Sequence, residues 1–311
     1  MKKALVLGGN GFIGQHLVKE LSKDYSVIVA DIVCDVLPAE NISYVNFDFT
    51  KNVDFAPLLN GVDMVFHLIS SIIPEDGTDN LEQEISDNMF STIKLLDAML
   101  AFSVRKIYFV SSGGTVYGNS TNKIQNELDR TLPICKYGFV KEATEKIFEL
   151  YYIMNGMQYR IIRLANPYGT KVRQGQRQGL LPILADCIWN NKAFHIWGDG
   201  ENIRDYIHIS DVTDAMRSIW EYDGPVRNFN VGSGRGYSIN EVINIMINSF
   251  QKKYDEVIYK SPRLCDVKRN VLDISCLTES TGWKPKIQLD DGVRMLTEQY
   301  MPRSIACEGQ I

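Results

Sequence analysis

One stretch of the sequence decides the fold: Gly8-Gly9-Asn10-Gly11-Phe12-Ile13-Gly14. It follows a short apolar run, Lys3–Leu7, that predicts a buried strand, and it opens a segment over residues 11–22 with the apolar spacing of a helix. The spacing Gly-x-Gly-x-x-Gly permits a tight strand-to-helix turn and the close approach of a pyrophosphate to free backbone N–H groups. The loop therefore predicts a dinucleotide site, with Gly8, Gly11, Phe12, Ile13 and Gly14 as cofactor-binding candidates.

A carboxylate, Asp31, ends the second predicted strand about 20 residues beyond Gly11. A carboxylate at that place accepts hydrogen bonds from the hydroxyls of an adenosine ribose and repels a 2′-phosphate, so Asp31 favours NAD over NADP. FAD is the main alternative cofactor. The alternative without a ligand is a tight turn followed by a surface aspartate. The pattern indicates a class of cofactor and leaves the reaction open.

The first half of the chain alternates apolar runs with helical patterns, which is typical of right-handed βαβ crossovers and a parallel sheet. Strands are expected at Lys3–Leu7, 27–30, 44–47, 64–68, 106–110 and Gln158–Leu164, and long helices at 84–102 and 136–154. Beyond residue 166 glycines and prolines interrupt the pattern, with helices expected at Leu180–Asn190 and Ile239–Phe250. The sequence predicts an α/β fold: a Rossmann-type doubly wound parallel sheet with a smaller C-terminal α/β substrate lobe. We expect the NAD-binding domain at residues 1–165, with returning segments near 205–215 and 228–232, and the lobe at 166–311.

Composition excludes several classes of partner. The 311 residues carry a net charge of −5 without a basic block, so nucleic acid is not expected as a partner. No apolar run is long enough to cross a membrane. The six cysteines are scattered without a Cys-x-x-Cys pair, and only four histidines are present, so neither a metal site nor a disulfide framework is expected. Reduced thiols suit a cytoplasmic protein.

A tyrosine and a lysine, Tyr137 and Lys141, are spaced to lie on one face of the helix expected over residues 136–154. A tyrosine near pKa 10 is a poor base at neutral pH, but a nearby ammonium favours its phenolate. Such a pair can also be a packed tyrosine beside a lysine that extends to solvent. The motifs around the pair decide between these interpretations.

These motifs occur in a fixed order along the chain. They are Asp48-Phe49-Thr50, His67-Leu68-Ile69-Ser70, Ser111-Ser112-Gly113-Gly114-Thr115-Val116-Tyr117-Gly118, Arg163-Leu164-Ala165-Asn166-Pro167-Tyr168-Gly169, Gly198-Asp199-Gly200, Arg204-Asp205-Tyr206-Ile207-His208, Asn230-Val231-Gly232-Ser233-Gly234 and Gly282-Trp283-Lys284-Pro285. Together with the glycine loop and the Tyr–Lys pair they resemble the extended short-chain dehydrogenase/reductases, in the NAD-dependent nucleotide-sugar epimerase/dehydratase branch that includes UDP-glucose 4-epimerase. The resemblance covers residues 3–300 and leaves the tail 301–311 outside it.

The resemblance implies a role for each candidate residue. Tyr137 would take the proton from a sugar hydroxyl while hydride leaves the same carbon for the nicotinamide, and Lys141 would lower the pKa of the tyrosine and hold the nicotinamide ribose. Further cofactor contacts are implied for Asp48 and Phe49 at the adenine and for His67 and Ser111. Substrate diphosphate or nucleotide contacts are implied for Asn166, Arg204 and Arg263. The alternative for Arg204 is a surface salt bridge with Asp205, but a guanidinium facing a cleft suits bidentate phosphate recognition.

The sequence departs from the family pattern at one catalytic position. The hydroxyl residue that the family places four residues before the tyrosine of Val-Tyr-Gly is Gly113 here. Ser112 and Thr115 are the available substitutes, and we favour Thr115. Either hydroxyl could instead be bonded to backbone at a strand end.

Three reactions of the family are compared through the residues before Val-Tyr-Gly. Dehydratases carry an Asp-Glu pair where this chain has Gly114 and Thr115, so dehydration is disfavoured. A 4-epimerase and an NDP-4-keto-6-deoxyhexose reductase share the same residues, but Asp31 favours NAD, which suits the self-contained epimerase cycle. A non-catalytic NAD-sensing binding protein is a more distant alternative, which Gly113 permits. We therefore predict a 4-epimerase of a UDP-hexose or UDP-N-acetylhexosamine that works through a transient 4-keto intermediate.

Two finer expectations complete the prediction. Asn270 falls where a bulky aromatic residue restricts some epimerases to sugars without an N-acetyl group, so the smaller asparagine predicts tolerance of N-acetylhexosamines. The helices expected over 84–102 and 136–154 resemble those that pair in family dimers, which predicts a homodimer by analogy. The implied biological role is the supply of precursors for surface polysaccharides.

Overall fold

Successive residues of each central strand point to opposite faces of a sheet that is covered by helices on both sides. The computed structural model describes residues 1–32, 40–51, 54–71, 80–120, 123–172, 179–263 and 265–301. Within these residues the main sheet has seven parallel strands in the order β10 (Asn228–Val231), β6 (Gln158–Leu164), β5 (Lys106–Ser112), β4 (Met64–His67), β1 (Lys3–Leu7), β2 (Ser26–Asp31) and β3 (Ile42–Asn46). The predicted Rossmann-type α/β fold is confirmed.

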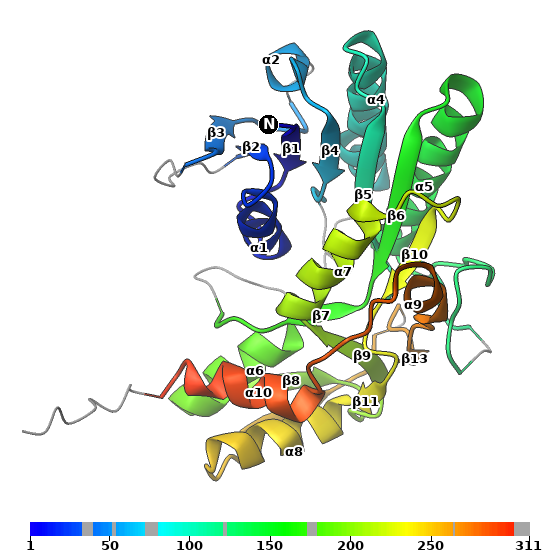
Figure 1. The fold of residues 1–311 in the computed structure, drawn as a ribbon. Helices are drawn as coiled ribbons and strands as arrows, with labels where there is room; N and C mark the ends of the chain where they lie inside the picture. The colour runs from blue at the N-terminus through cyan, green and yellow to red at the C-terminus, as the bar shows by residue number, and fades with distance from the viewer. Residues whose placement is uncertain are drawn as a thin grey trace, which may run out of the picture.

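The two faces of the sheet have separate cores. On one face Ala4 and Val6 pack with residues of α1 (Phe12–Leu21) and α7 (Ile209–Glu221). On the other, Leu5 and Leu7 pack with α2 (Ala56–Leu59), α4 (Ser91–Ala101) and α5 (Lys136–Asn155). Figure 1 shows α1 and α5 on opposite sides of the strands. Burial on both faces explains why the central strands are continuous apolar runs.

The helix expected over residues 84–102 is divided into three parts, which corrects that prediction. It consists of α3 (Leu81–Ile85), the π-helical turn η1 (Ser86–Phe90) and α4. The reason lies at Asn88, whose side chain accepts a hydrogen bond from the backbone N–H of Ser71 and donates to the Ser71 hydroxyl and the Glu84 carbonyl. The wider turn brings this amide inside the protein, where it ties the helix to the end of the β4 region.

The smaller lobe lies below the carboxyl edge of the sheet (Figure 1). Its core is formed by α6 (Leu180–Asn190), α8 (Ile239–Phe250) and α10 (Leu289–Glu298). Among the described residues, β9 (Ile203–His208) pairs with β7 (Asn166–Tyr168), β11 (Gly236–Ser238) and β13 (Arg269–Asn270), and β8 (Phe194–Trp197) pairs with β12 (Val257–Lys260). α9 (Ser275–Thr281) packs on β10.

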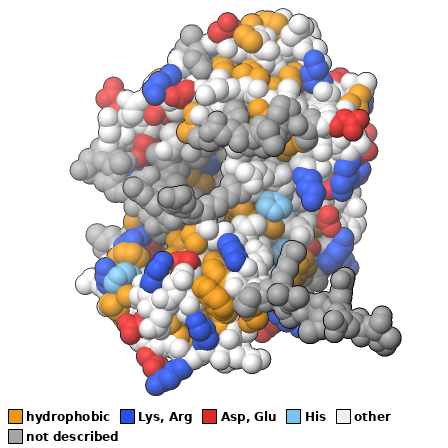
Figure 2. Space-filling view, turned by 90° about the vertical axis from the view of Figure 1, so that its left-hand side faces the viewer, with side chains coloured by type: hydrophobic (Ala, Val, Ile, Leu, Met, Phe, Trp, Pro, Cys, Tyr) orange, Lys and Arg blue, Asp and Glu red, His pale blue; other side chains and the backbone are white. Residues whose placement is uncertain are grey.

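The chain crosses between the two parts more than once. Strand β10 returns to the main sheet and pairs with β6, whereas β9 belongs to a sheet of the lobe, and α7, which follows β9, packs on α1. The tail 302–311 lies outside the described residues. No helix in the described ranges is long and apolar enough to span a membrane. On the face seen in Figure 2, basic and acidic side chains are interspersed.

We expect Gly14→Ala to lower the free energy of unfolding by about 1–3 kcal/mol, measured by urea denaturation. A Cβ at Gly14 would lie 2.3 Å from the Gly8 carbonyl oxygen and 2.6 Å from the Gly9 Cα, so helix α1 could not pack against the loop. Gly11→Ala is the matched control, because the nearest atom to its Cβ is the Gly8 oxygen at 3.2 Å. Equal losses in the two variants would contradict this account of the loop.

Candidate active site

The glycine loop forms an open cradle at the carboxyl end of β1. Gly8 has φ +80°, a backbone conformation that favours glycine, and its carbonyl accepts the N–H of Gly11 at 3.1 Å. A side chain at Gly11 would meet nothing nearer than that carbonyl, so the surface of the loop is open above Gly11. Phe12 and Ile13, in the first turn of α1, are partly buried against the core. The loop and the start of α1 fit a pyrophosphate.

The carboxylate of Asp31 lies beside this cradle at the end of β2. One oxygen accepts the backbone N–H of Asn10 at 2.9 Å, and the other accepts the N–H of Ile32 at 2.8 Å. These bonds hold the carboxylate at the edge where the glycine loop turns. A groove of about 430 Å³ adjoins the loop, between Asn10 and Tyr44. The residues present fit NAD.

The two residues predicted to contact adenine, Asp48 and Phe49, have side chains in different surroundings. Asp48 accepts hydrogen bonds from the backbone and hydroxyl of Thr50, and its salt bridge with Lys51 is 3.0 Å long. The Thr50 and Lys51 hydrogen bonds lower the pKa of Asp48 to about 2, so it is ionised. Phe49 as a whole is 2% exposed, and its ring packs against Phe55 and His67 in the core, so its contact with adenine stays a prediction.

Two further cofactor candidates, His67 and Ser111, have their side chains turned into the interior. The imidazole of His67 bonds the Thr92 hydroxyl at 3.1 Å, and burial lowers its pKa to about 3, so it is neutral. The hydroxyl of Ser111 donates to the carboxylate of Glu145. The cofactor contacts of these two residues stay predictions: the Ser111 hydroxyl has a partner inside the protein, whereas Nδ1 of His67 has none among the described residues.

The Tyr–Lys pair lies at the start of α5, next to the end of β5. Cys135 caps the helix by accepting the N–H of Gly138, and Lys141 Nζ donates to the Val110 carbonyl at 3.0 Å and lies 5.8 Å from the centre of the Tyr137 ring. Burial lowers the pKa of Lys141 to about 7 and raises that of Tyr137 to about 12. The two groups are therefore held together in a site of low polarity, and the tyrosine is protonated before a cofactor binds.

Of the two candidate hydroxyls, Ser112 interacts with Tyr137. A hydrogen bond from Ser112 opposes the effect of burial on the pKa of Tyr137. The Thr115 hydroxyl is buried with no partner among the described residues, and its backbone and Cβ pack against Gly138. The structure therefore favours Ser112 over Thr115, and the identity of the catalytic hydroxyl stays a prediction. The sequence signal was present, because Ser112 is the last residue of β5 and so reaches the carboxyl edge of the sheet.

Gly113 is explained by a residue far along the chain. A Cβ at Gly113 would lie 2.6 Å from Leu272 Cδ1 and 3.0 Å from the Arg163 carbonyl oxygen. The carbonyl of Gly113 accepts the side-chain amide of Asn270 at 2.8 Å. The place of the usual hydroxyl side chain is therefore filled by Leu272, which leaves the catalytic hydroxyl to the neighbouring Ser112.

The position of Asn270 corrects the expectation that it leaves room in a sugar pocket. Its side chain is 1% exposed, and its amide donates to Gly113 and to Gln125. Open space exists instead above Gly114, where an added Cβ would have the Ser112 hydroxyl at 3.8 Å and the amide of Asn166 at 4.0 Å as its nearest neighbours. A ligand can approach Ser112 from this side.

The remaining substrate candidates lie on the lobe. The side-chain amide of Asn166 donates to the carbonyl of Asp205 at 2.9 Å. Arg204 is partly buried, and burial lowers the pKa of its guanidinium. The negative charge of Asp266 acts on this pKa in the opposite direction. The carboxylate of Asp205 is fully buried and accepts the backbone N–H groups of Ser233, Gly234 and Leu272, so the alternative of an Arg204–Asp205 surface salt bridge is ruled out.

One aromatic residue that the sequence reasoning missed, Trp197, positions a predicted arginine. The guanidinium of Arg263 lies 3.7 Å from the centre of the Trp197 ring, and a backbone turn links Arg263 to Asp266. The stacked guanidinium is held in one plane, which suits bidentate recognition of a diphosphate. The signal was an aromatic residue at the end of a strand, directly before Gly198-Asp199-Gly200.

A buried polar network supports the reaction site from below. Arg163 and Glu145 form an ion pair of 2.7 Å, and Arg163 also donates to the hydroxyl of Tyr117 at 2.9 Å. Tyr117 in turn donates to Asn230 of β10. Sequence reasoning placed Arg163, Tyr117 and Asn230 in motifs but missed Glu145, although it follows Lys141 by one helical turn.

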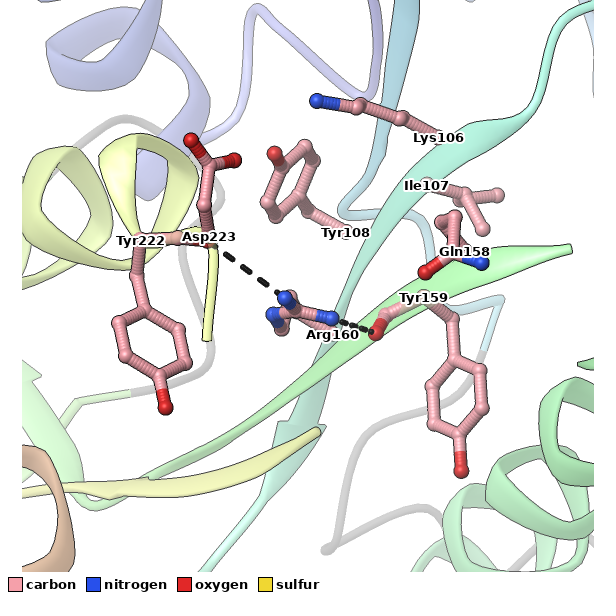
Figure 3. A pocket seen from close by; sticks show the side chains of 8 residues that line it. All are labelled: Lys106, Ile107, Tyr108, Gln158, Tyr159, Arg160, Tyr222 and Asp223. Atoms are coloured by element: carbon pink, nitrogen blue, oxygen red, sulfur yellow. Dashed lines mark hydrogen bonds between the residues drawn. The ribbon is translucent and has the colours of Figure 1, made fainter. Parts of the chain in front are cut away.

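A second, smaller cavity lies at the opposite edge of the sheet. It has a volume of about 100 Å³ and is lined by residues at the amino ends of β5 and β6, among them Tyr108 and Arg160 (Figure 3). Arg160 is held there by the carbonyls of Tyr159 and Gly224. Ligands of open α/β sheets bind at the carboxyl ends of the strands, so this cavity is not the reaction site.

The chain is similar to known proteins over almost its whole length. The sequence pattern described as "NAD dependent epimerase/dehydratase family" matches residues 4–232. A protein from Methanocaldococcus jannaschii with the provisional name UDP-glucose 4-epimerase is 32% identical, over 93% of this chain and 95% of that protein. The dTDP-4-dehydro-6-deoxyglucose reductase of Escherichia coli is 29% identical, over 98% of this chain and 98% of that protein. A UDP-glucose 4-epimerase of Mycolicibacterium smegmatis is also 29% identical, over 97% of this chain and 99% of that protein. A crystal structure of UDP-glucose 4-epimerase from Thermotoga maritima with UDP-glucose superimposes with a TM-score of 0.88 at 29% identity, covering 96% of this chain and 98% of that one.

We expect Gly113→Ser to lower the free energy of unfolding by about 1–3 kcal/mol, because Leu272 occupies the space of the new side chain. The same substitution in a Leu272→Ala background should cost less, since the clash with Leu272 is removed. Urea denaturation of the four proteins of this cycle measures the coupling. An equal cost in both backgrounds would refute the role assigned to Leu272.

Proposed function

Because the chain belongs to the NAD dependent epimerase/dehydratase family, we propose that it is an NAD-dependent nucleotide-sugar 4-epimerase. Its substrate would be a UDP-hexose or UDP-N-acetylhexosamine, inverted at C4 through a transient 4-keto intermediate. The observation that carries the proposal is the placement of Ser112 next to Tyr137, with buried Lys141 one turn along the same helix and open space above Gly114. This arrangement lies at the carboxyl edge of the sheet, where Asp31 and the glycine loop fit NAD.

The chain's own groups perform the proton transfers. Tyr137 accepts the proton of the C4 hydroxyl, and Ser112 holds that hydroxyl in line with the tyrosine. NAD held by the glycine loop and Asp31 would supply the redox chemistry, as the acceptor and later the donor of the C4 hydride. Lys141 places an ammonium near the tyrosine, and this positive charge favours the phenolate that burial disfavours. The proton returns from Tyr137 to the C4 oxygen when the keto sugar has presented its other face.

The lobe would hold the nucleotide part of the substrate. Arg204 and Arg263 would supply guanidinium groups for the diphosphate, and the amide of Asn166 adjoins the space above Gly114. Binding through the diphosphate leaves the sugar free to rotate, which a 4-epimerase requires. The absence of a carboxyl group at Gly114 and Thr115 disfavours dehydration, which needs a separate acid and base.

A 4-ketoreductase is the second candidate, and the full-length similarity to the E. coli reductase favours it. The two functions differ in the fate of the hydride: an epimerase returns it to the sugar that supplied it, and a reductase needs a stoichiometric donor. Asp31 supports NAD kept in the site rather than NADPH exchanged at each turnover. We further propose a cytoplasmic enzyme that supplies precursors for surface polysaccharides, because nucleotide-linked hexoses are activated donors for glycan assembly.

Purified protein incubated with UDP-glucose or UDP-GlcNAc should convert each substrate to its C4 epimer without added NAD(P)H and without a net change in NADH absorbance. Chromatography of the nucleotide sugars measures the conversion. Stoichiometric oxidation of NAD(P)H by a dTDP-4-keto-6-deoxyhexose, with no conversion of UDP-hexoses, would instead establish the reductase.

Tyr137→Phe should lower kcat by about 10²–10⁴-fold, because it removes the group that exchanges the proton. NAD binding, measured by isothermal titration calorimetry, should change little. Tyr151→Phe is the control, since it removes a hydroxyl from the same helix whose partner, Asp97, lies outside the site. Turnover that survives in Tyr137→Phe would exclude the tyrosine as the base.

The outer face of α5 suggests a self-association surface, and we propose a homodimer. Leu150, Ile153 and Met154 lie on one face of the helix, and Ile153 and Met154 are 71% and 70% exposed. Phe90 of η1 and Phe102 after α4 are exposed as well. Exposed apolar clusters of this kind are typical of protein interfaces.

We expect the wild-type protein to have about twice the 35.3 kDa chain mass by light scattering, and Ile153→Glu to shift it towards the monomer. A buried charge without a partner at an interface opposes association. Ile258→Glu, at an exposed isoleucine of β12, is the matched control and should leave the mass unchanged. A monomeric wild type would contradict the proposed dimer.

A further inference from the structure

The inner face of α5 meets β5 through two polar contacts in addition to its apolar packing. Lys141 donates to the carbonyl of Val110, and one helical turn later Glu145 accepts the hydroxyl of Ser111. Val110 and Ser111 are consecutive residues near the end of β5. Lys141 and Glu145 are both buried, at 5% and 6% exposure. The strand therefore fixes both charged side chains on the same side of the helix.

The carboxylate of Glu145 is held from the next strand as well. Arg163 lies opposite Ser111 in the register of β5 and β6, and its guanidinium donates to both oxygens of Glu145, at 2.7 Å for the shortest contact. This geometry is the fork-to-fork pairing of a guanidinium with a carboxylate. Arg163 is itself oriented by the hydroxyl of Tyr117. A buried negative charge is thus fixed one turn from Lys141.

The charged and titratable groups around Lys141 come from four elements. His67 of β4 is neutral, because burial lowers its pKa to about 3. Arg163 of β6 faces Glu145, and Glu84 of α3 is buried in a helix that also packs on α5. Burial is the largest influence on Lys141 and lowers its pKa to about 7, and the charge of Glu145 acts in the opposite direction. Tyr137, on α5 itself, shares the site.

We propose that Glu145 is a positioning residue of the active site: its carboxylate, fixed by Ser111 and Arg163, keeps the amine of Lys141 protonated inside the protein. The inference rests on the proposed function, in which the ammonium of Lys141 favours the phenolate of Tyr137. Glu145 touches neither substrate nor cofactor and acts only through Lys141. An uncharged residue at position 145 would leave burial unopposed, and Lys141 would lose its proton at a lower pH.

The test is a direct titration of Lys141 by NMR in protein labelled with ¹³C-lysine, with the signal assigned from Lys141→Met. Glu145→Gln keeps the shape and the acceptor for Ser111 but removes the charge, and it should lower the titration midpoint of Lys141 by about one pH unit or more, a tenfold change in the proton dissociation constant. Glu149→Gln is the matched control, because Glu149 lies one turn further along α5 and pairs with Lys146 at the surface. In Glu149→Gln the titration midpoint of Lys141 should equal that of the wild type.

Glu145→Gln leaves Arg163 buried without its counterion, so the double variant Glu145→Gln/Arg163→Gln is included as a form without an unpaired buried charge. The midpoint should fall in this variant too. The alkaline decline of kcat should move to lower pH by the same interval, whereas a merely structural role would lower the amount of folded enzyme without moving the decline. A wild-type midpoint in the folded double variant would overturn the proposal, as would failure of both Gln variants to fold while Glu149→Gln folds.

The titration of Lys141 does not depend on turnover, so the two proposals can fail separately. If the wild type is inactive but the Lys141 midpoint is lower in Glu145→Gln than in the wild type, the epimerase activity is refuted and the link between Glu145 and Lys141 is retained. An active wild type whose midpoint is insensitive to Glu145 would retain the epimerase and refute the link.

Discussion

The ion pair between Glu145 and Arg163 is the interaction on which the arrangement of the site depends. It lies where α5, β5 and β6 meet, in a mostly apolar interface that also holds the Ser111 and Lys141 hydrogen bonds, and each partner is less than a tenth exposed. Apolar contacts tolerate small rotations of a helix, but a bidentate ion pair has one geometry. The pair therefore sets the rotation of α5 on the sheet, and with it the direction in which Tyr137 leaves the first turn.

The glycines of the site are of two kinds: some are required by close packing inside the protein, and one leaves open space. Gly14 and Gly113 make room for atoms of the protein itself, the carbonyl of Gly8 and the side chain of Leu272. Gly114 has no such neighbour, and its missing side chain leaves space for a ligand. Gly113 therefore belongs to the buried wall of the site and the adjacent Gly114 to its open side. The spacing of the sequence motifs does not reveal this difference.

Much of the fold could be predicted because its signals are local. The apolar strand before the glycine loop, Asp31 at a strand end and the i, i+4 spacing of Tyr137 and Lys141 each depend on a few adjacent residues. The features that could not be predicted depend on contacts between distant segments. Ser112 was ranked below Thr115 because the filling of Gly113 by Leu272 is invisible in the sequence, and the π-helical turn at Asn88 arises from its bond with Ser71. The burial of Asn270 has the same origin.

The contact between Asn270 and Gly113 also bears on how the molecule is assembled, since the two residues are 157 positions apart in the chain. A ribosome that has released the first half of the protein has released the glycine loop, Asp31 and the Tyr–Lys pair, but neither β10 at the sheet edge nor the leucine behind Gly113. Contacts of such long sequence separation form late in folding. The cofactor half can therefore take shape during synthesis, while the wall beside Ser112 closes only when nearly the whole polypeptide is available. In this protein the cofactor side of the site and the wall beside Ser112 are thus completed at different stages of synthesis.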